Sequence, residues 1–315
     1  MYKKTPQDNI FFKYFFFILL STICISCEKS PSNPTAEKQK PIILTTFTIL
    51  ADLAENIAGE RLEVKSITKF GAEIHGYQPT PSDIVKAANA DLIIENGLGL
   101  DLWSRKFTSS ANVPYVTLTK GIEPLLIEGE SYSGKPNPHA WMSPARTIIY
   151  VENLVSAFSK LDPDGKIYYL KNAKVYKNKL INLDNDLRTI LNTIPLSKRV
   201  LVSCEGAFSY LARDYGMEEA YLWPVNSESQ VTPRRMQKLI DLIKERQIPS
   251  IFCESTVSSK PQRQVAKSSG SKFGGTFYVD SLSQENGPAP TLIDLQRHNV
   301  RLLQKGLSSQ YVKND

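Results

Sequence analysis

The chain has 315 residues and a formal net charge of +6, and both values limit the kinds of protein it can be. The length is enough for two domains of ordinary size, each with its own hydrophobic core. The basic residues are scattered and form no Arg- and Lys-rich stripe with interleaved aromatic side chains, so we expect no nucleic-acid partner.

The first segment of the chain has the pattern of an export signal. Lys3 and Lys4 precede an almost wholly apolar run, 11–26, which is shorter than a typical transmembrane helix. Cys27 follows this run and a polar stretch follows Cys27, as in a bacterial lipoprotein cleavage site, although Cys24 stands where Leu is usual. We predict a signal peptide over 1–26, lipidation of Cys27 and a flexible tether over 27–40. The alternative is an ordinary cleaved signal and a soluble exported protein.

Apolar runs alternate with helical patterns from Pro41 onward. Pro81 and Ser82 mark the start of one of these helices, with Ser82 as its expected N-cap. The expected strands cover 42–48, 62–68, 91–95 and 115–118, and the expected helices cover 50–58, 83–90 and 144–160. This order of elements predicts a parallel sheet that is covered by helices on both faces.

A long helical pattern follows over 166–194. Its apolar residues recur every three or four positions, at Tyr176, Leu180, Leu183, Leu187, Ile190 and Ile194. Pro195 ends the pattern. A helix of this length fits either a coiled-coil segment or a strut that packs along two domains.

A second series of strands and helices completes the chain. The expected strands cover 199–203, 220–223, 250–253 and 276–279, and the expected helices cover 207–215, 233–246 and 291–307. The whole pattern predicts an α/β protein with two Rossmann-like lobes, 41–164 and 196–315, joined by one long rigid helix, 165–195. A ligand should bind in the cleft between the lobes, outside the carboxyl ends of the strands.

Two of the chain's three histidines lie in loops of similar character. His75 stands in GAEIHGYQPTPSD, after an expected strand, and His139 stands in NPHAWMSP. Pro and Gly make such loops stiff and tightly turned, so each loop can hold an imidazole in a fixed direction. The third, His298, lies on the expected C-terminal helix and should be structural.

Two carboxylates follow strands of the second series. Glu205 comes after the strand 199–203, and Asp280 comes after the strand 276–279. With His75 and His139 they form a set of two imidazoles and two carboxylates, whose charge of about −2 matches a divalent cation. Carboxylate oxygens suit Mn²⁺ and Fe²⁺, and Zn²⁺ can use the same set. We expect Glu254 to brace a loop near this cleft.

Cys204 and Cys253 remain after the two N-terminal cysteines are set aside. Both lie near the ends of apolar runs that could form neighbouring strands, and an exported compartment permits a disulfide. The sequence leaves open whether they form a disulfide or two buried free thiols. Adjacent strand residues face opposite sides, so Cys204 should point away from the cleft if Glu205 points into it.

From about residue 42 to its end, the chain resembles the manganese-, zinc- and iron-binding receptor lipoproteins of ABC importers. The resemblance rests on both histidine motifs quoted above, on NGLGLDLW with Asp101 where Glu is usual, and on SCEGAFSYLARDYG, YVDSLS and LIDLQRHNV. It implies that His75, His139, Glu205 and Asp280 are the metal ligands. It also implies that an ABC permease with its ATPase is the partner. Four protein ligands would fill the metal site and no further base is evident, so we do not expect an enzyme.

The resemblance also bears on the cargo. Members similar to zinc importers usually have His where this chain has Glu205, and many have a His-rich loop before the second motif, whereas 121–138 contains no histidine. This favours Mn²⁺ or Fe²⁺ over Zn²⁺. We expect an exported monomer, periplasmic or on the outer face of the membrane. A metal-dependent hydrolase and an adhesin with a structural metal are the alternatives.

Overall fold

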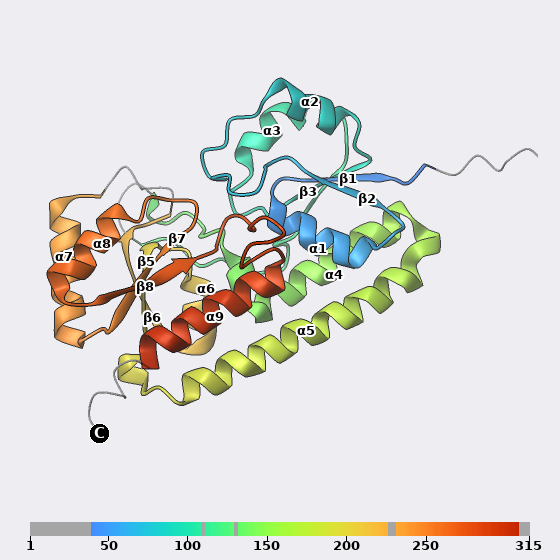
Figure 1. Cartoon of the computed structure of the whole chain (residues 1–315). Helices are drawn as coiled ribbons and strands as arrows, with labels where there is room; N and C mark the ends of the chain where they lie inside the picture. Colours follow the sequence, from blue (N-terminus) through green and yellow to red (C-terminus); the bar gives the residue numbers. More distant parts are fainter. Residues whose placement is uncertain (1–38, 109–110, 129–131, 226–230, 309–315) are drawn as a thin grey trace, which may run out of the picture. The chain divides into compact units, whose positions relative to one another are not determined.

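The structure, a computed structural model, describes residues 39–108, 111–128, 132–225 and 231–308 (Figure 1). The predicted signal peptide, Cys27 and nearly all of the tether lie outside these residues. In the part of the chain that is described, no helix is both long and apolar enough to cross a membrane.

The first half is built on one parallel sheet. Its strands, in the order β2-β1-β3-β4, are β1 (Ile42–Thr45), β2 (Glu63–Ser66), β3 (Leu92–Glu95) and β4 (Tyr115–Thr117). The accompanying helices are α1 (Thr48–Ala58), α2 (Pro81–Ala88), α3 (Leu102–Thr108) and α4 (Pro144–Leu161). Ile43 and Ile94 pack with residues of α1 and α4, whereas Leu44 and Ile93 pack with residues of α2 and α3. The sheet therefore carries helices on both faces, as predicted.

The second half contains two parallel strand pairs. β5 (Val200–Glu205) pairs with β6 (Glu218–Trp223), and β7 (Ser250–Glu254) pairs with β8 (Lys272–Phe277). The helices are α6 (Ser209–Tyr215), α7 (Pro233–Arg246), α8 (Lys260–Ser269) and α9 (Leu292–Ser308). β5 and β7 lie side by side, although their backbones form no ladder among the described residues.

The long helix α5 (Lys166–Asn192) joins the two halves and packs against α1, α4 and α9 (Figure 1). Its buried side chains are Tyr169, Ala173, Tyr176, Leu180, Leu183, Leu187 and Leu191. The helix is about 40 Å long, since each residue adds 1.5 Å. The α/β class and the packed strut are thus confirmed, and the coiled-coil alternative is not what the contacts show.

Some local predictions were wrong. The N-cap of α2 is Thr80, not Ser82, because the carboxylate of Asp83 accepts the Thr80 backbone N–H and fixes the start of the helix. The last strand, β8, covers Lys272–Phe277 and ends before Val279, so Asp280 stands three residues beyond it. The helices α3 and α8 were not predicted.

Candidate metal centre

The four predicted ligands come together at the carboxyl ends of the strands. The loop from β2 to α2 carries His75, and the segment before the 3-10 turn Ala140–Met142 carries His139. Glu205 is the last residue of β5, and Asp280 lies in the segment after β8. The potential ligand atoms of all four residues lie within 4.8 Å of one another.

The distances within this cluster suit one shared ion. Nε2 of His75 lies 3.1 Å from Nε2 of His139, which is the separation of about 3.0–3.5 Å expected for two nitrogens that each lie about 2.1 Å from one metal. A carboxylate oxygen of Asp280 lies 3.4 Å from Nε2 of His139 and 3.7 Å from Nε2 of His75. A Glu205 oxygen lies 3.6 Å from Nε2 of His75.

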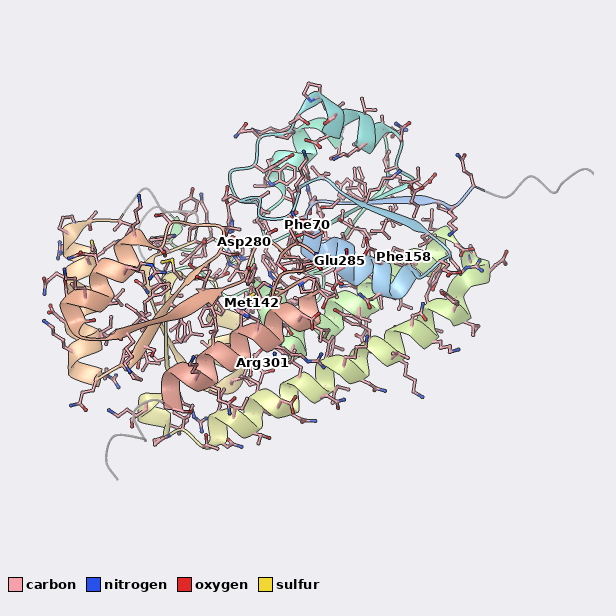
Figure 2. The ribbon with its side chains drawn as sticks, in the orientation of Figure 1. Phe70, Met142, Phe158, Asp280, Glu285 and Arg301 are labelled. Atoms are coloured by element: carbon pink, nitrogen blue, oxygen red, sulfur yellow. A yellow bond between two sulfur atoms is a disulfide. The ribbon has the colours of Figure 1, made fainter. Side chains whose placement is uncertain are left out.

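The cluster is shielded from solvent. The side chains of His139, Asp280, Glu205 and His75 are only 0, 1, 4 and 6% exposed, respectively. Asp280 (Figure 2) accepts a hydrogen bond from the Thr256 hydroxyl through one oxygen, and its other oxygen has no hydrogen-bond partner. Buried carboxylate oxygens without a donor are costly unless a cation compensates them. A bound cation would therefore compensate the Asp280 oxygen that faces the two imidazoles.

Asn137 fixes the direction of the His139 ring. Its side-chain oxygen lies 2.8 Å from Nδ1 of His139 and accepts the His139 backbone N–H at 3.1 Å. When Nδ1 carries the proton for this bond, Nε2 presents its lone pair to the cluster. The Asn137 amide also donates to the carbonyl oxygen of Gly206, the residue after Glu205. We did not predict this role for Asn137, although an Asn two residues before a His in a loop can indicate a hydrogen bond to the His ring.

Two further contacts hold the ligand loops in place. The Trp141 indole lies against the ring of His139, at 5.0 Å between centroids, and donates to the carbonyl oxygen of Val279. The Glu73 carboxylate accepts the backbone N–H groups of His75 and Gly76. Each of these bonds reduces the freedom of a loop that carries a predicted ligand.

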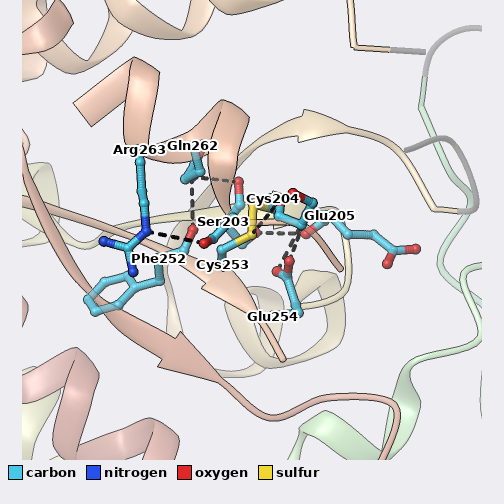
Figure 3. The surroundings of a disulfide bond; sticks show 10 residues. Ser203, Cys204, Glu205, Phe252, Cys253, Glu254, Gln262 and Arg263 are labelled. Carbon is cyan, nitrogen blue, oxygen red and sulfur yellow. Dashed lines mark hydrogen bonds between the residues drawn. A yellow bond between two sulfur atoms is a disulfide. The ribbon is translucent and has the colours of Figure 1, made fainter. Parts of the chain in front are cut away.

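Cys204 and Cys253 form a disulfide between β5 and β7 (Figure 3). Figure 3 shows the Glu205 side chain extending away from it, as the alternation along a strand requires. Beside the disulfide, the carboxyl oxygens of Glu254 accept the Glu205 backbone N–H at 3.3 and 3.4 Å. Glu254 thus braces the end of β5 that carries Glu205, in agreement with the expectation from the sequence.

The charges in the cluster influence one another strongly. Burial alone would lower the pKa of His75, but the carboxylates of Glu205 and Asp280 outweigh burial and raise that pKa to about 9. Burial opposes ionisation of Asp280, yet the two imidazoles hold its pKa well below the usual range. Burial, reinforced by Glu205, raises the pKa of Glu254 well above its ordinary value. Burial thus favours the protonated form of Glu254, and the imidazoles favour the ionised form of Asp280.

Comparisons with known proteins identify the family. The profile of the family described as "Zinc-uptake complex component A periplasmic" matches residues 43–306. This chain belongs to that family. The iron-binding protein YfeA of Yersinia pestis is 51% identical over 292 residues, which cover 92% of this chain and 93% of YfeA. The manganese ABC transporter substrate-binding lipoprotein PsaA of Streptococcus mitis is 32% identical, over 93% of this chain and 97% of PsaA.

Solved structures of similar proteins confirm the fold. The manganese-bound periplasmic metal-binding protein of Candidatus Liberibacter asiaticus has a TM-score of 0.79 and 38% identity, and the match covers 85% of this chain and 100% of that protein. The periplasmic zinc-binding protein TroA of Treponema pallidum has a TM-score of 0.79 and 26% identity, over 85% and 99% of the two chains. These relatives are named as binding proteins, so neither a hydrolase nor an adhesin is favoured.

Proposed function

We propose that this protein is an extracytoplasmic receptor that captures a divalent transition metal and delivers it to an ABC permease and its ATPase. One observation carries the proposal. Four side chains from separate segments, two in each half of the chain, have nitrogen and oxygen atoms within 4.8 Å of one another; three of these residues are buried and His75 is partly buried. Its relatives are named for iron, manganese and zinc, and family membership gives the receptor role.

In this proposal His75, His139, Glu205 and Asp280 are the ligands, and they fill the coordination sphere of the cargo. Two neutral imidazoles and two carboxylates neutralise a divalent ion. The two carboxylates favour Mn²⁺ or Fe²⁺ as the cargo, because these ions prefer oxygen ligands. Zn²⁺ would compete, because it binds the same nitrogen and oxygen ligands more tightly than Mn²⁺ or Fe²⁺ does.

The proposal also covers membrane anchoring and domain organisation. Lipidation of Cys27 would anchor the chain outside the cytoplasm through the tether 27–40, as a monomer that collects ions for the permease. Lobes 41–164 and 196–315 would contribute two ligands each, on either side of the linker 165–195. Because α5 packs along both halves, only modest movement between them should accompany binding.

The test compares metal-induced thermal stabilisation among single variants. His139→Ala and Asp280→Ala should each remove most of the rise in melting temperature that Mn²⁺ gives the parent protein. His298→Gln is a matched control, because His298 contacts the backbone oxygen of Thr276 outside the cluster. An unchanged shift in His139→Ala would contradict the ligand assignment. Elemental analysis of protein purified from its native host would then identify the cargo.

A further inference from the structure

The outward face of α5 has an unusual composition. Between Lys166 and Leu183 the chain contains five lysines and no acidic residue. Ile167, Lys171, Lys174, Asn178 and Ile181 recur at spacings of four, three, four and three, so they form one stripe, which we call the outer stripe. It lies opposite the buried stripe of the same helix.

Large aliphatic side chains are exposed along this face. Ile167 is 76% exposed, Val175 54%, and Leu170 and Ile181 45% each. Exposed apolar residues are ordinary when they are scattered. Here two of the four belong to the outer stripe and two flank it, in a helix segment without acidic residues, so together with the lysines they form a mixed apolar and basic surface. Lys177 pairs with Glu152 of α4, and the other four lysines have no acidic partner among the described residues.

The start of the described chain lies close to the N-terminal end of α5. The carbonyl oxygen of Pro41 accepts the backbone N–H of Glu63 at the start of β2. Arg61 pairs with Asp162 just before α5, and the backbone N–H of Glu60 lies 3.5 Å from the Tyr168 hydroxyl in its first turn. A tether of about 13 residues can extend at most about 45 Å. An anchor at Cys27 would therefore keep Pro41 within about 45 Å of the membrane, a distance that lets the first turns of α5 reach its surface.

We propose that the outer stripe of α5, with the flanking Leu170 and Val175, is a docking surface for an anionic lipid bilayer. Lysines are attracted to the negative surface of such a bilayer, and exposed aliphatic side chains enter its interfacial region. The contact does not depend on the metal centre.

The test uses residues 27–315 with Cys27→Ser, so that no acyl chain contributes; Lys40–Asp315 forms a compact unit by itself. The protein should co-sediment with phosphatidylcholine vesicles that contain about one-third phosphatidylglycerol and should not bind pure phosphatidylcholine. About 0.5 M salt should release it, because screening shortens the reach of the charges. Absence of binding to the anionic vesicles would overturn the proposal.

Two double variants separate a docking surface from general positive charge. Lys171→Glu/Lys174→Glu should weaken vesicle binding about 25-fold or more, since each lysine near an anionic surface contributes about fivefold. Lys260→Glu/Lys267→Glu makes the same change of charge on the exposed face of α8, where no large aliphatic side chain is exposed, and should leave binding within about twofold. Equal weakening by both variants would overturn the proposal.

A fluorescent probe distinguishes a bilayer from a soluble polyanion. An environment-sensitive dye on Ile167→Cys should shift to shorter wavelength on anionic vesicles, whereas the same dye on Lys267→Cys should not. Heparin tests charge alone. If heparin binds as tightly as the vesicles and the Ile167→Cys dye shows no shift on vesicles, the surface recognises polyanions and the bilayer proposal fails. Both variants should keep the parent melting temperature, because both positions are exposed.

Discussion

The side-chain oxygen of Asn137 lies 2.8 Å from Nδ1 of His139. The amide nitrogen of the same side chain donates to the backbone carbonyl oxygen of Gly206, the residue after Glu205. One amide therefore connects His139, a proposed ligand from the first half of the chain, to the backbone beside Glu205, a proposed ligand from the second. Outer partners of this kind typically change metal affinity by about 10- to 100-fold when they are removed.

We predict that Asn137→Ala weakens Mn²⁺ binding by about 10- to 100-fold. Asn137→Asp should bind more tightly than Asn137→Ala, because it keeps the acceptor for Nδ1. Ser209→Ala is the control, since it removes a contact of the Asn137 amide and leaves the bond to His139. Titration calorimetry gives the affinities. Equal Mn²⁺ affinity in Asn137→Ala and the parent would show that the ring needs no such partner.

Metal affinity should depend on pH through His75. The carboxylates raise the pKa of His75 to about 9, so its imidazole carries a proton at neutral pH in the metal-free protein. Binding must displace this proton, and the dissociation constant should rise about tenfold for each unit of pH lost below about 8. The proton released on binding should appear as a dependence of the calorimetric enthalpy on the buffer. A dissociation constant that is flat between about pH 8 and 6 would contradict this assignment.

Asp52 should make the free energy of unfolding depend on pH. Burial raises its pKa from 3.8 to about 6, against the hydrogen bond from the Leu292 backbone N–H. The folded protein thus holds the proton more tightly than the unfolded chain. This preference stabilises the fold in acid, and stability is lost as the pH rises through about 4 to 6.

Asp52→Asn keeps an acceptor for Leu292 and removes the buried charge. We expect it to raise the free energy of unfolding by up to about 3 kcal/mol at pH 7.5, and the difference from the parent should vanish near pH 4. Urea denaturation at the two pH values measures both quantities. A variant that is less stable than the parent at the higher pH would show that the charged form is the favourable one.

The disulfide should contribute substantially to stability. It joins residues 49 apart in the sequence. Closing a loop of that size lowers the conformational entropy of the unfolded chain and so raises the free energy of unfolding by about 4 kcal/mol. The free energy of unfolding of the double variant Cys204→Ala/Cys253→Ala should be lower than that of the parent by about 4 kcal/mol. A reductant should lower the denaturation midpoint of the parent toward that of the variant and leave the variant unchanged. If the parent keeps its midpoint after complete reduction, the bridge contributes little.

The alternation of apolar strands and amphipathic helices made the fold class predictable, because each pattern has its own period. The clustering of the four predicted ligands could be expected because two are histidines in loops stiffened by Pro and Gly, and two are carboxylates at or after the ends of strands. α8 was missed because its sequence, KPQRQVAKSS, buries only Gln262, Val265 and Ala266. β8 was misplaced because Gly274 and Gly275 weaken its strand pattern. Gln262 donates to backbone carbonyl oxygens of β5 and β7, a tertiary contact that no local pattern shows.

The disulfide illustrates the same limit. The sequence places Cys204 and Cys253 near strand ends, but β5 and β7 belong to different strand pairs. Only the packing of those pairs brings the two cysteines together. The domain boundaries at 164 and 195 stay predictions for a related reason, since α5 contacts helices of both halves along its length.

The central claim is that His75, His139, Glu205 and Asp280 bind one divalent ion. A crystal structure of protein loaded with Mn²⁺, with anomalous diffraction data collected at the manganese absorption edge, tests it most directly. One strong anomalous peak should lie within about 2.0–2.3 Å of Nε2 of both histidines and of an oxygen from each carboxylate. A peak elsewhere, or no peak between these side chains in fully loaded protein, would contradict it.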